Sequence, residues 1–287
     1  MAGNALAFNT IEIVGLSGAL IIILTAILSS SIHRLSTWYL ILGSGAVYSF
    51  SMLLLAMTHE QTGPEPQFLV CLVQGALIYS SPIWLMSTSF AFAIQFHLTV
   101  LYHVEGYAGR IHRDSKWLPF STVIFFFGFT VVFLVTGIVQ PHTVQRNAEQ
   151  LYCHFTSNIG VYPVSIFGVA FAAGSAVCEF KSGMLLYRHW KYKNDFYHQS
   201  NGQVSIGVMI RLASFSLVSM LSVASCTLYI IPSLKNFGDV IVYNAFMSNV
   251  DVLILGLNMS IIQAWMFWKK KPATKIAIQV EVEQSQS

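Results

Sequence analysis

Residues 117–140 read WLPFSTVIFFFGFTVVFLVTGIVQ, a stretch of 24 residues that contains no charged side chain. A helix rises about 1.5 Å per residue and the hydrocarbon core of a bilayer is about 30 Å thick, so about 20 apolar residues are needed to cross it. This stretch is therefore long and apolar enough to span a membrane. We expect it to be a helix, because each backbone amide in lipid must be bonded within its own segment.

Six further segments meet the same criterion. The seven predicted spans cover residues 10–32, 37–57, 67–102, 117–140, 161–187, 204–231 and 240–268. Prolines support these boundaries, because seven of the eight fall at predicted helix ends or in loops, where a missing N–H costs little. Only Pro82 lies well inside a span, and we expect it to kink the outer half of the third helix. The sequence predicts an all-α membrane protein, a seven-transmembrane helix bundle.

The composition agrees with lipid as the surroundings of most of the chain. Only 9% of the residues are charged, whereas soluble domains carry roughly a quarter. A net charge of +3 is far from the clustered basic face of a nucleic-acid-binding protein, so no nucleic-acid partner is expected. The first ten residues contain no basic side chain, and we interpret the first span as an uncleaved anchor.

Basic residues predict the orientation of the bundle. Lys and Arg are retained on the cytoplasmic side of membrane proteins, and eleven of them follow the first, third, fifth and seventh spans. The alternate loops hold only Arg146 and Lys235. We therefore expect residues 1–9 outside the cell, residues 10–268 in the bundle and residues 269–287 as a cytoplasmic tail. The expected location is the membrane, crossed several times, and the plasma membrane in particular.

Two of the four cysteines fall on the predicted outer side. Cys71 lies in the first turn of the third helix and Cys153 in the second outer loop, both facing an oxidising compartment. A disulfide between them would close a loop of about 80 residues and stabilise the fold by about 4 kcal/mol on chain-entropy grounds. The alternative is two unrelated thiols on the same side. Cys178 and Cys226 lie within spans, where a thiol behaves as a small apolar group.

Seven helices, an outer N-terminus and a Cys71–Cys153 pair together resemble the G protein-coupled receptor superfamily. The resemblance covers residues 10–268. It implies that an external ligand shifts the helical bundle and that a heterotrimeric G protein binds the altered cytoplasmic face.

The motifs of the rhodopsin-like branch differ from those of this chain. Where that branch has an acidic–Arg–aromatic triplet, this chain reads Gln95-Phe96-His97, and its seventh helix lacks the Asn-Pro-x-x-Tyr motif. The stretch from Ser200 to Leu212, which includes the pair Arg211-Leu212, resembles the entry into helix six of the a-factor-type pheromone receptors of fungi.

Ionisable residues inside spans are costly and therefore mark candidate functional sites. Glu179 and Arg211 lie at a similar depth in the fifth and sixth helices, and we hypothesise that they pair in the resting state. The alternative is that each side chain reaches the cytoplasmic interface separately. Glu12 lies at the outer start of the first helix, where we expect it to reach water. His97 is interpreted as a packing or interface residue.

The seventh helix carries a polar stripe. At 100° per residue, Asn244, Ser248, Asp251 and Asn258 share one face that should point into the bundle. One interpretation is a hydrated network that rearranges on activation, with a proton or sodium ion at Asp251. The other is a static polar seam between helices.

Candidate ligand-binding and partner-binding residues come from the two ends of the bundle. Apolar cavities with a few polar groups hold small ligands, and the outer halves of the helices supply candidates for such a pocket. They are Gln74, Tyr79, Tyr162, Ser165, Tyr229, Tyr243 and Asn244. The expected ligand is small, lipid-like or a short peptide, because no large external domain precedes the bundle. Candidates for contact with a G protein are Arg110, Arg113, Lys116, Arg188, Lys191 and Lys193.

Other function classes fit the sequence less well. A transporter or channel, with a polar path along helix seven, is the alternative, although the chain lacks the internal repeats typical of many transporters. The scattered histidines have no metal-ligand spacing, which argues against a zinc-dependent hydrolase. A retinal-binding protein needs a Lys in its seventh helix, and residues 240–268 contain none. We expect no enzymatic activity, no metal and no cofactor.

Overall fold

The computed structural model describes residues 2–29, 35–105, 116–147, 149–193, 214, 221, 238–256 and 259–266. The long helices are α1 (Ala2–Leu28), α2 (Ser36–Met57), α3 (Phe68–Glu105), α4 (Trp117–Val139), α5 (Val161–Lys193) and α7 (Gly238–Gly256). A short helix α8 (Met259–Trp265) follows α7. A 3₁₀ turn, η1 (Pro141–Thr143), precedes a hairpin of β1 (Val144–Arg146) and β2 (Cys153–Phe155).

The prediction of an all-α membrane protein agrees with these elements. Five helices, α1 to α5, are long and apolar enough to cross a membrane. The predicted sixth span, 204–231, lies almost entirely outside the described residues. Pro82 lies inside α3, as expected.

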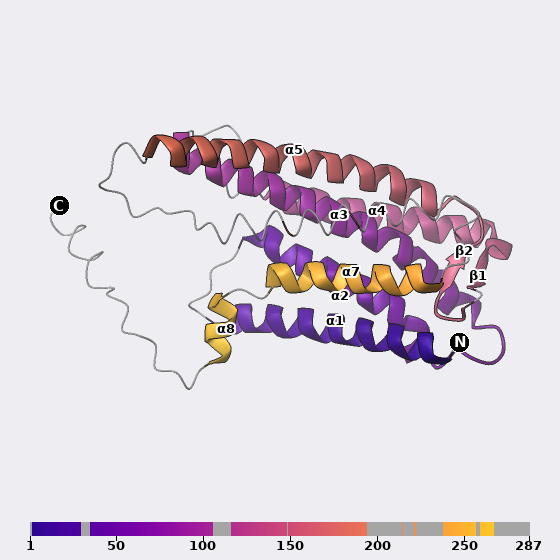
Figure 1. Ribbon diagram of the computed structural model, residues 1–287. Coiled ribbons are helices and arrows are strands. Elements are labelled where there is room, and N and C mark those ends of the chain that lie inside the picture. The colour runs from indigo at the N-terminus through magenta and orange to yellow at the C-terminus, as the bar shows by residue number, and fades with distance from the viewer. Residues whose placement is uncertain are drawn as a thin grey trace.

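The first and last predicted spans differ from the structure. Helix α1 begins at Ala2, so residues 2–9, expected to form a separate outer segment, belong to the helix. The span predicted over 240–268 is not one helix, because α7 ends at Gly256 and α8 runs across its direction (Figure 1). Helix α8 packs on the end of α1, where Ile261 is buried beside Ala26 and Trp265 donates a hydrogen bond to Thr25. Burial of Ile261 against α1 favours this placement of α8 over a straight continuation of α7.

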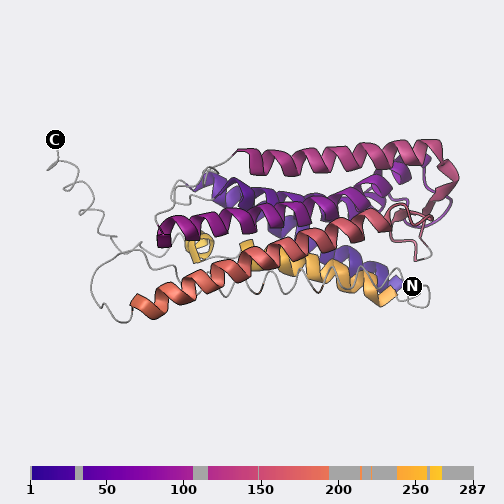
Figure 2. The same cartoon turned by 90° about the horizontal axis from the view of Figure 1, so that it is seen from above.

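Helix α3 lies at the centre of the described bundle. It packs against α2, α4 and α5, while α1 packs against α2 and α7. Figures 1 and 2 show the long helices running side by side, with the hairpin at the same end as the N-terminus. Polar contacts link α2 and α3 deep in the bundle, since Ser44 and Thr88 are hydrogen-bonded at 3.2 Å and both are fully buried.

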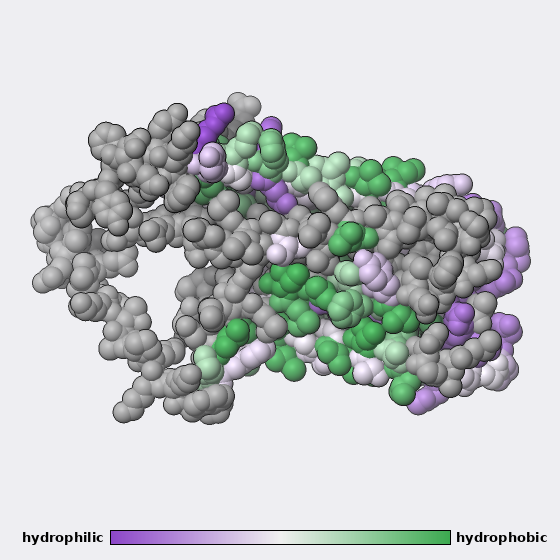
Figure 3. Space-filling view, in the orientation of Figure 1, coloured by the Kyte–Doolittle hydropathy of each residue, from purple (hydrophilic) through white to green (hydrophobic). Residues whose placement is uncertain are grey.

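Apolar side chains cover the outside of the bundle. On α4, Phe127, Val131 and Val135 are more than half exposed, which suits contact with lipid tails. Figure 3 shows hydrophobic residues over the helices and hydrophilic residues gathered at the end that carries the hairpin. The polar end marks one edge of the apolar band.

Candidate functional site

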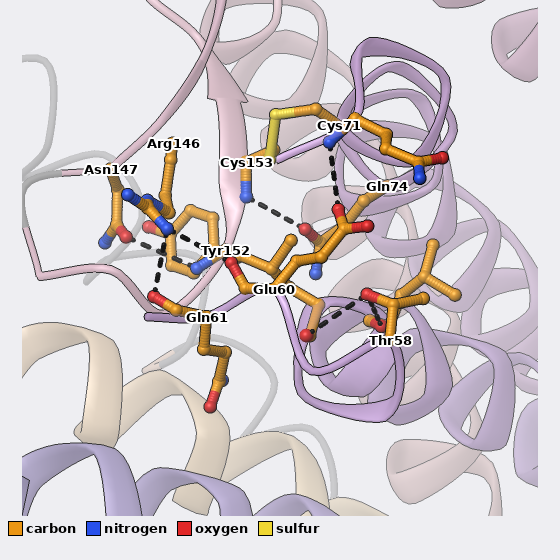
Figure 4. The surroundings of a disulfide bond; sticks show 12 residues. Thr58, Glu60, Gln61, Cys71, Gln74, Arg146, Asn147, Tyr152 and Cys153 are labelled. Carbon is orange, nitrogen blue, oxygen red and sulfur yellow. Dashed lines mark hydrogen bonds between the residues drawn. A yellow bond between two sulfur atoms is a disulfide. The ribbon is translucent and has the colours of Figure 1, made fainter. Parts of the chain in front are cut away.

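A disulfide joins Cys71 to Cys153, as the sequence predicts. The two Cα atoms lie 5.2 Å apart, and both side chains are buried. The bond fastens β2 to the first turns of α3 at the polar end of the bundle (Figure 4). Strand β2 pairs with β1 in antiparallel register, so the disulfide holds the whole hairpin over α3. We call this hairpin, residues 144–155, the cap.

A second attachment ties the cap to the loop between α2 and α3. Arg146 on β1 donates three hydrogen bonds to that loop. The acceptors are the carbonyl oxygens of Glu60, Gln61 and Gly63, at 3.1, 3.2 and 3.0 Å. Bonds from a charged donor are stronger than neutral ones, so one side chain holds three carbonyl groups of the loop in place. Figure 4 shows this arginine beside the disulfide.

Gln74, a predicted pocket residue, forms a third attachment. Its side chain is fully buried between α2 and the cap. The amide nitrogen donates to the carbonyl of Ser51 at 3.0 Å, and the amide oxygen accepts from the backbone N–H of Cys153 at 2.9 Å. Both ends of the amide are therefore engaged in joining α2, α3 and β2.

We predict that Gln74→Leu destabilises the protein by about 1–3 kcal/mol, because it leaves the buried N–H of Cys153 without an acceptor. Thermal melting of the purified protein in detergent measures this loss. The matched control is Gln67→Leu, since the Gln67 side chain is exposed. Unchanged melting combined with a lost ligand response would instead assign Gln74 to ligand binding.

An aromatic cluster lies beneath the cap. Phe155 on β2 is 2% exposed, and its ring lies 5.6 Å from that of Tyr79 and 6.1 Å from that of Phe133. Helix α4 approaches closely here, because a Cβ atom at Gly137 would lie 2.3 Å from Leu72 Cδ1. Tyr79, another predicted pocket residue, thus faces the cap from α3.

The other pocket candidates are distributed over several surfaces. Ser165 on α5 is buried, whereas Tyr162 and Tyr243 are 50% and 36% exposed. Tyr229 and the side chain of Asn244 lie outside the described residues. Gln74 and Tyr79 are brought together by their common contact with β2, and Tyr162 and Tyr243 are not part of that contact region.

Glu12 is the residue whose surroundings differ most from expectation. We expected its carboxylate to reach water, but the side chain is fully buried. It lies against Ser49 of α2 and Asn249 of α7, yet neither side chain completes a hydrogen bond of good geometry to it. Both carboxylate oxygens lack a hydrogen-bond partner among the described residues. We call Glu12, Ser49 and Asn249 the polar triad.

The depth of Glu12 in the membrane predicts its position along α1 but not the direction in which its side chain points. Buried residues recur along α1 at alternating spacings of four and three, which places them on one face of the helix, in contact with other helices. The buried residues of this face are Phe8, Glu12, Gly15, Ala19, Ile22 and Ala26. The structure therefore places Glu12 on the inner face of α1. Asn249 lies about 100° around α7 from Ser248, outside the predicted polar stripe.

The candidates in the rest of the bundle are only partly described. Glu179 on α5 is half-buried, and on the neighbouring turn Ser182 is hydrogen-bonded to His97 of α3 at 2.9 Å. Lys116 and Arg188 are exposed. Arg110, Arg113, Arg211 and Asn258 lie outside the described residues, as do the side chains of Ser248, Asp251, Lys191 and Lys193.

Comparison with known proteins gives no family for this chain. No family model matches the sequence, and no curated protein matches it. Within the described part of the chain, no group of three His, Cys, Asp or Glu side chains is placed to hold a metal ion.

Proposed function

We propose that this protein is a seven-helix receptor that senses an external small, lipid-like or short peptide ligand and signals to a heterotrimeric G protein. The observation that carries the proposal is the cap, held by the Cys71–Cys153 disulfide to the central helix of the bundle. A ligand that binds against such a cap would act on α3, to which the cap is bonded. Because α3 packs against α2, α4 and α5, a displacement of α3 would change its packing against all three.

The charge distribution supports an outer cap and a cytoplasmic opposite end. The cap and the N-terminus lie at one end of the bundle, and α1 and α3 end at the other (Figure 1). Eleven Lys and Arg residues belong to the segments assigned to that other end, against two, Arg146 and Lys235, in the segments assigned to the outer side. A basic surface of this kind would be available to a G protein on the cytoplasmic side of the plasma membrane.

A nucleotide-exchange assay tests the proposal. The purified protein is reconstituted in lipid with heterotrimeric G proteins and exposed to panels of lipids, short peptides, lipopeptides and volatile compounds. We expect at least one ligand class to accelerate exchange, and we expect the double substitution Lys116→Gln, Arg188→Gln to weaken it about tenfold, since two exposed charges at the cytoplasmic end would be lost.

The matched control is Glu65→Gln, an exposed charge change in the α2–α3 loop beside the cap, which should leave exchange unaltered. If no ligand class and no G protein gives exchange above the empty-lipid background, the receptor proposal is wrong. Protease protection of tagged termini checks the orientation in the same preparation, and a tail exposed outside the cell would contradict it.

Transport is the second candidate, and the polar triad favours it. Fully buried carboxylates that face a bundle interior line ion and proton paths in many membrane proteins. Solute or proton flux into liposomes containing the purified protein, in the absence of nucleotide exchange, would select this function over the receptor.

A further inference from the structure

Among the described residues, Glu12 of the polar triad is the one Asp, Glu, Lys or Arg side chain that is buried. Glu12, Ser49 and Asn249 are 0%, 2% and 7% exposed, and each comes from a different helix. Glu12 lies in a membrane-length apolar helix, one turn below Asn9. A bare carboxylate in such surroundings is strongly disfavoured unless a positive charge or several donors compensate it.

The described helices around Glu12 supply no Lys or Arg side chain. Helices α1, α2, α3 and α7 contain neither Lys nor Arg. The other titratable side chains on these helices are Tyr39 and Tyr48 of α2, then Tyr79, His97, Tyr102, His103 and Glu105 of α3, and Asp239, Tyr243 and Asp251 of α7. His97 is hydrogen-bonded to Ser182 of α5 at 2.9 Å. The side chains of the two aspartates lie outside the described residues, and neither would be a cation.

The hydrogens of Ser49 and Asn249 have acceptors other than Glu12. The amide nitrogen of Asn249 donates hydrogen bonds to the carbonyl oxygens of Ala245 at 2.8 Å and Ile11 at 3.2 Å. The amide oxygen of Asn249 receives only a long bond of 3.5 Å from Ser49. The two carboxylate oxygens of Glu12 and the amide oxygen of Asn249 therefore have fewer hydrogen-bond donors than they can accept from.

Asn249 is fixed in this position by close packing. A Cβ atom at Gly15 would lie 1.5 Å from Oδ1 of Asn249, so the amide lies directly on the backbone of α1. From the outer side the triad is covered by a reciprocal amide pair, in which Asn9 donates to Gln61 at 2.9 Å and Gln61 donates back at 3.1 Å. Phe8, fully buried, packs in the same region against Leu151 of the cap.

We propose that Glu12 is a proton-binding site, whose bound proton makes a hydrogen bond from the Glu12 carboxyl to Oδ1 of Asn249 and so joins α1 to α7. One proton removes the buried charge and supplies the missing hydrogen in a single step. Any movement that separates α7 from α1 breaks this bond, lets water reach the carboxyl and releases the proton. The site does not depend on the receptor proposal, since it follows from the packing of α1, α2 and α7.

Stability against pH tests the site, with the sign fixed by linkage. A free Glu ionises near about pH 4.3, so above that pH the unfolded chain binds fewer protons than the folded one. The unfolding equilibrium constant should then rise by up to about tenfold per pH unit from that point until Glu12 itself ionises. Melting in lipid nanodiscs between about pH 5 and about pH 8 should show this component in the wild type.

Two substitutions separate Glu12 from other titrating groups. Glu12→Gln keeps a donor for Asn249 without a titrating proton, so the pH component should vanish while folding is retained. Asp251→Asn should keep it. An equal pH dependence of the wild type and Glu12→Gln would overturn the proposal, as would loss of the component in Asp251→Asn alone.

Infrared spectroscopy at neutral pH gives an independent readout if a variant folds poorly. The wild type should show a protonated carboxyl band that Glu12→Gln lacks and Asp251→Asn retains. Absence of that band in the wild type contradicts a bound proton. Stabilisation by sodium at fixed pH, absent in Glu12→Gln, would assign the site to a metal cation instead and equally overturn the proposal.

Discussion

Replacing Cys71 or Cys153 with Ser should destabilise the protein by about 4 kcal/mol and abolish most of its folded yield. The bond closes a loop of 82 residues, and the chain-entropy model gives about 4.5 kcal/mol for a loop of that size. Domains have a total stability of about 5–15 kcal/mol, so this loss removes a large part of it. The loss also frees β2, which carries Phe155 and the N–H that bonds to Gln74.

Folded yield and thermal melting of the purified protein measure the effect of each substitution. The double substitution Cys71→Ser, Cys153→Ser should be no worse than either single one, because both act by removing the same bond. Cys178→Ser is the matched control, since Cys178 is a free cysteine on α5. If the control and the two single variants melt together, the disulfide does not hold the cap.

Much of the architecture could be predicted because hydrocarbon thickness and charge leave direct marks in the sequence. The helix predicted over 117–140 appears as α4, Trp117–Val139, since it is bounded by Lys116 and Pro141. The Cys71–Cys153 bond was predictable from depth and compartment alone. These features depend on position along the membrane normal, which one sequence reports well.

The faces of the helices could not be predicted in the same way. A helix in lipid is apolar on its outer surface as well as its inner one, so its hydrophobic pattern has no clear stripe. Glu12 was therefore placed at the right depth but assigned to water instead of the helix contact. The role of Gln74 depends on Cys153, 79 residues away, and long-range contacts of this kind leave no local signal.

The break between α7 and α8 was missed for a related reason. Residues 240–268 are apolar enough for one long span, and hydropathy does not distinguish a straight helix from one that turns at its end. The placement of α8 is stabilised by tertiary contacts, in which Trp265 donates a hydrogen bond to Thr25 of α1. Packing of this kind outweighs the local preference for a continuous helix.

Phe155→Ala should have the other large effect, a loss of about 3–5 kcal/mol, because it empties the space beneath the cap. The ring is almost completely buried and contacts Tyr79 and Phe133 from two helices. Its removal leaves a cavity that α4 cannot fill without moving, since Gly137 already lies against Leu72 at close range. Thermal melting of the purified protein in detergent measures the loss.

Phe127→Ala on α4 is the matched control, because the Phe127 ring is 60% exposed on a helix that also contacts Phe155. Removing an exposed side chain should change stability by no more than about 0.5 kcal/mol. The contrast between the two alanine variants separates burial beneath the cap from the general loss of an aromatic ring. Equal melting temperatures would mean that Phe155 leaves its place beneath the cap in the lipid-embedded protein, and that the cap is held to α3 by the disulfide and polar bonds alone.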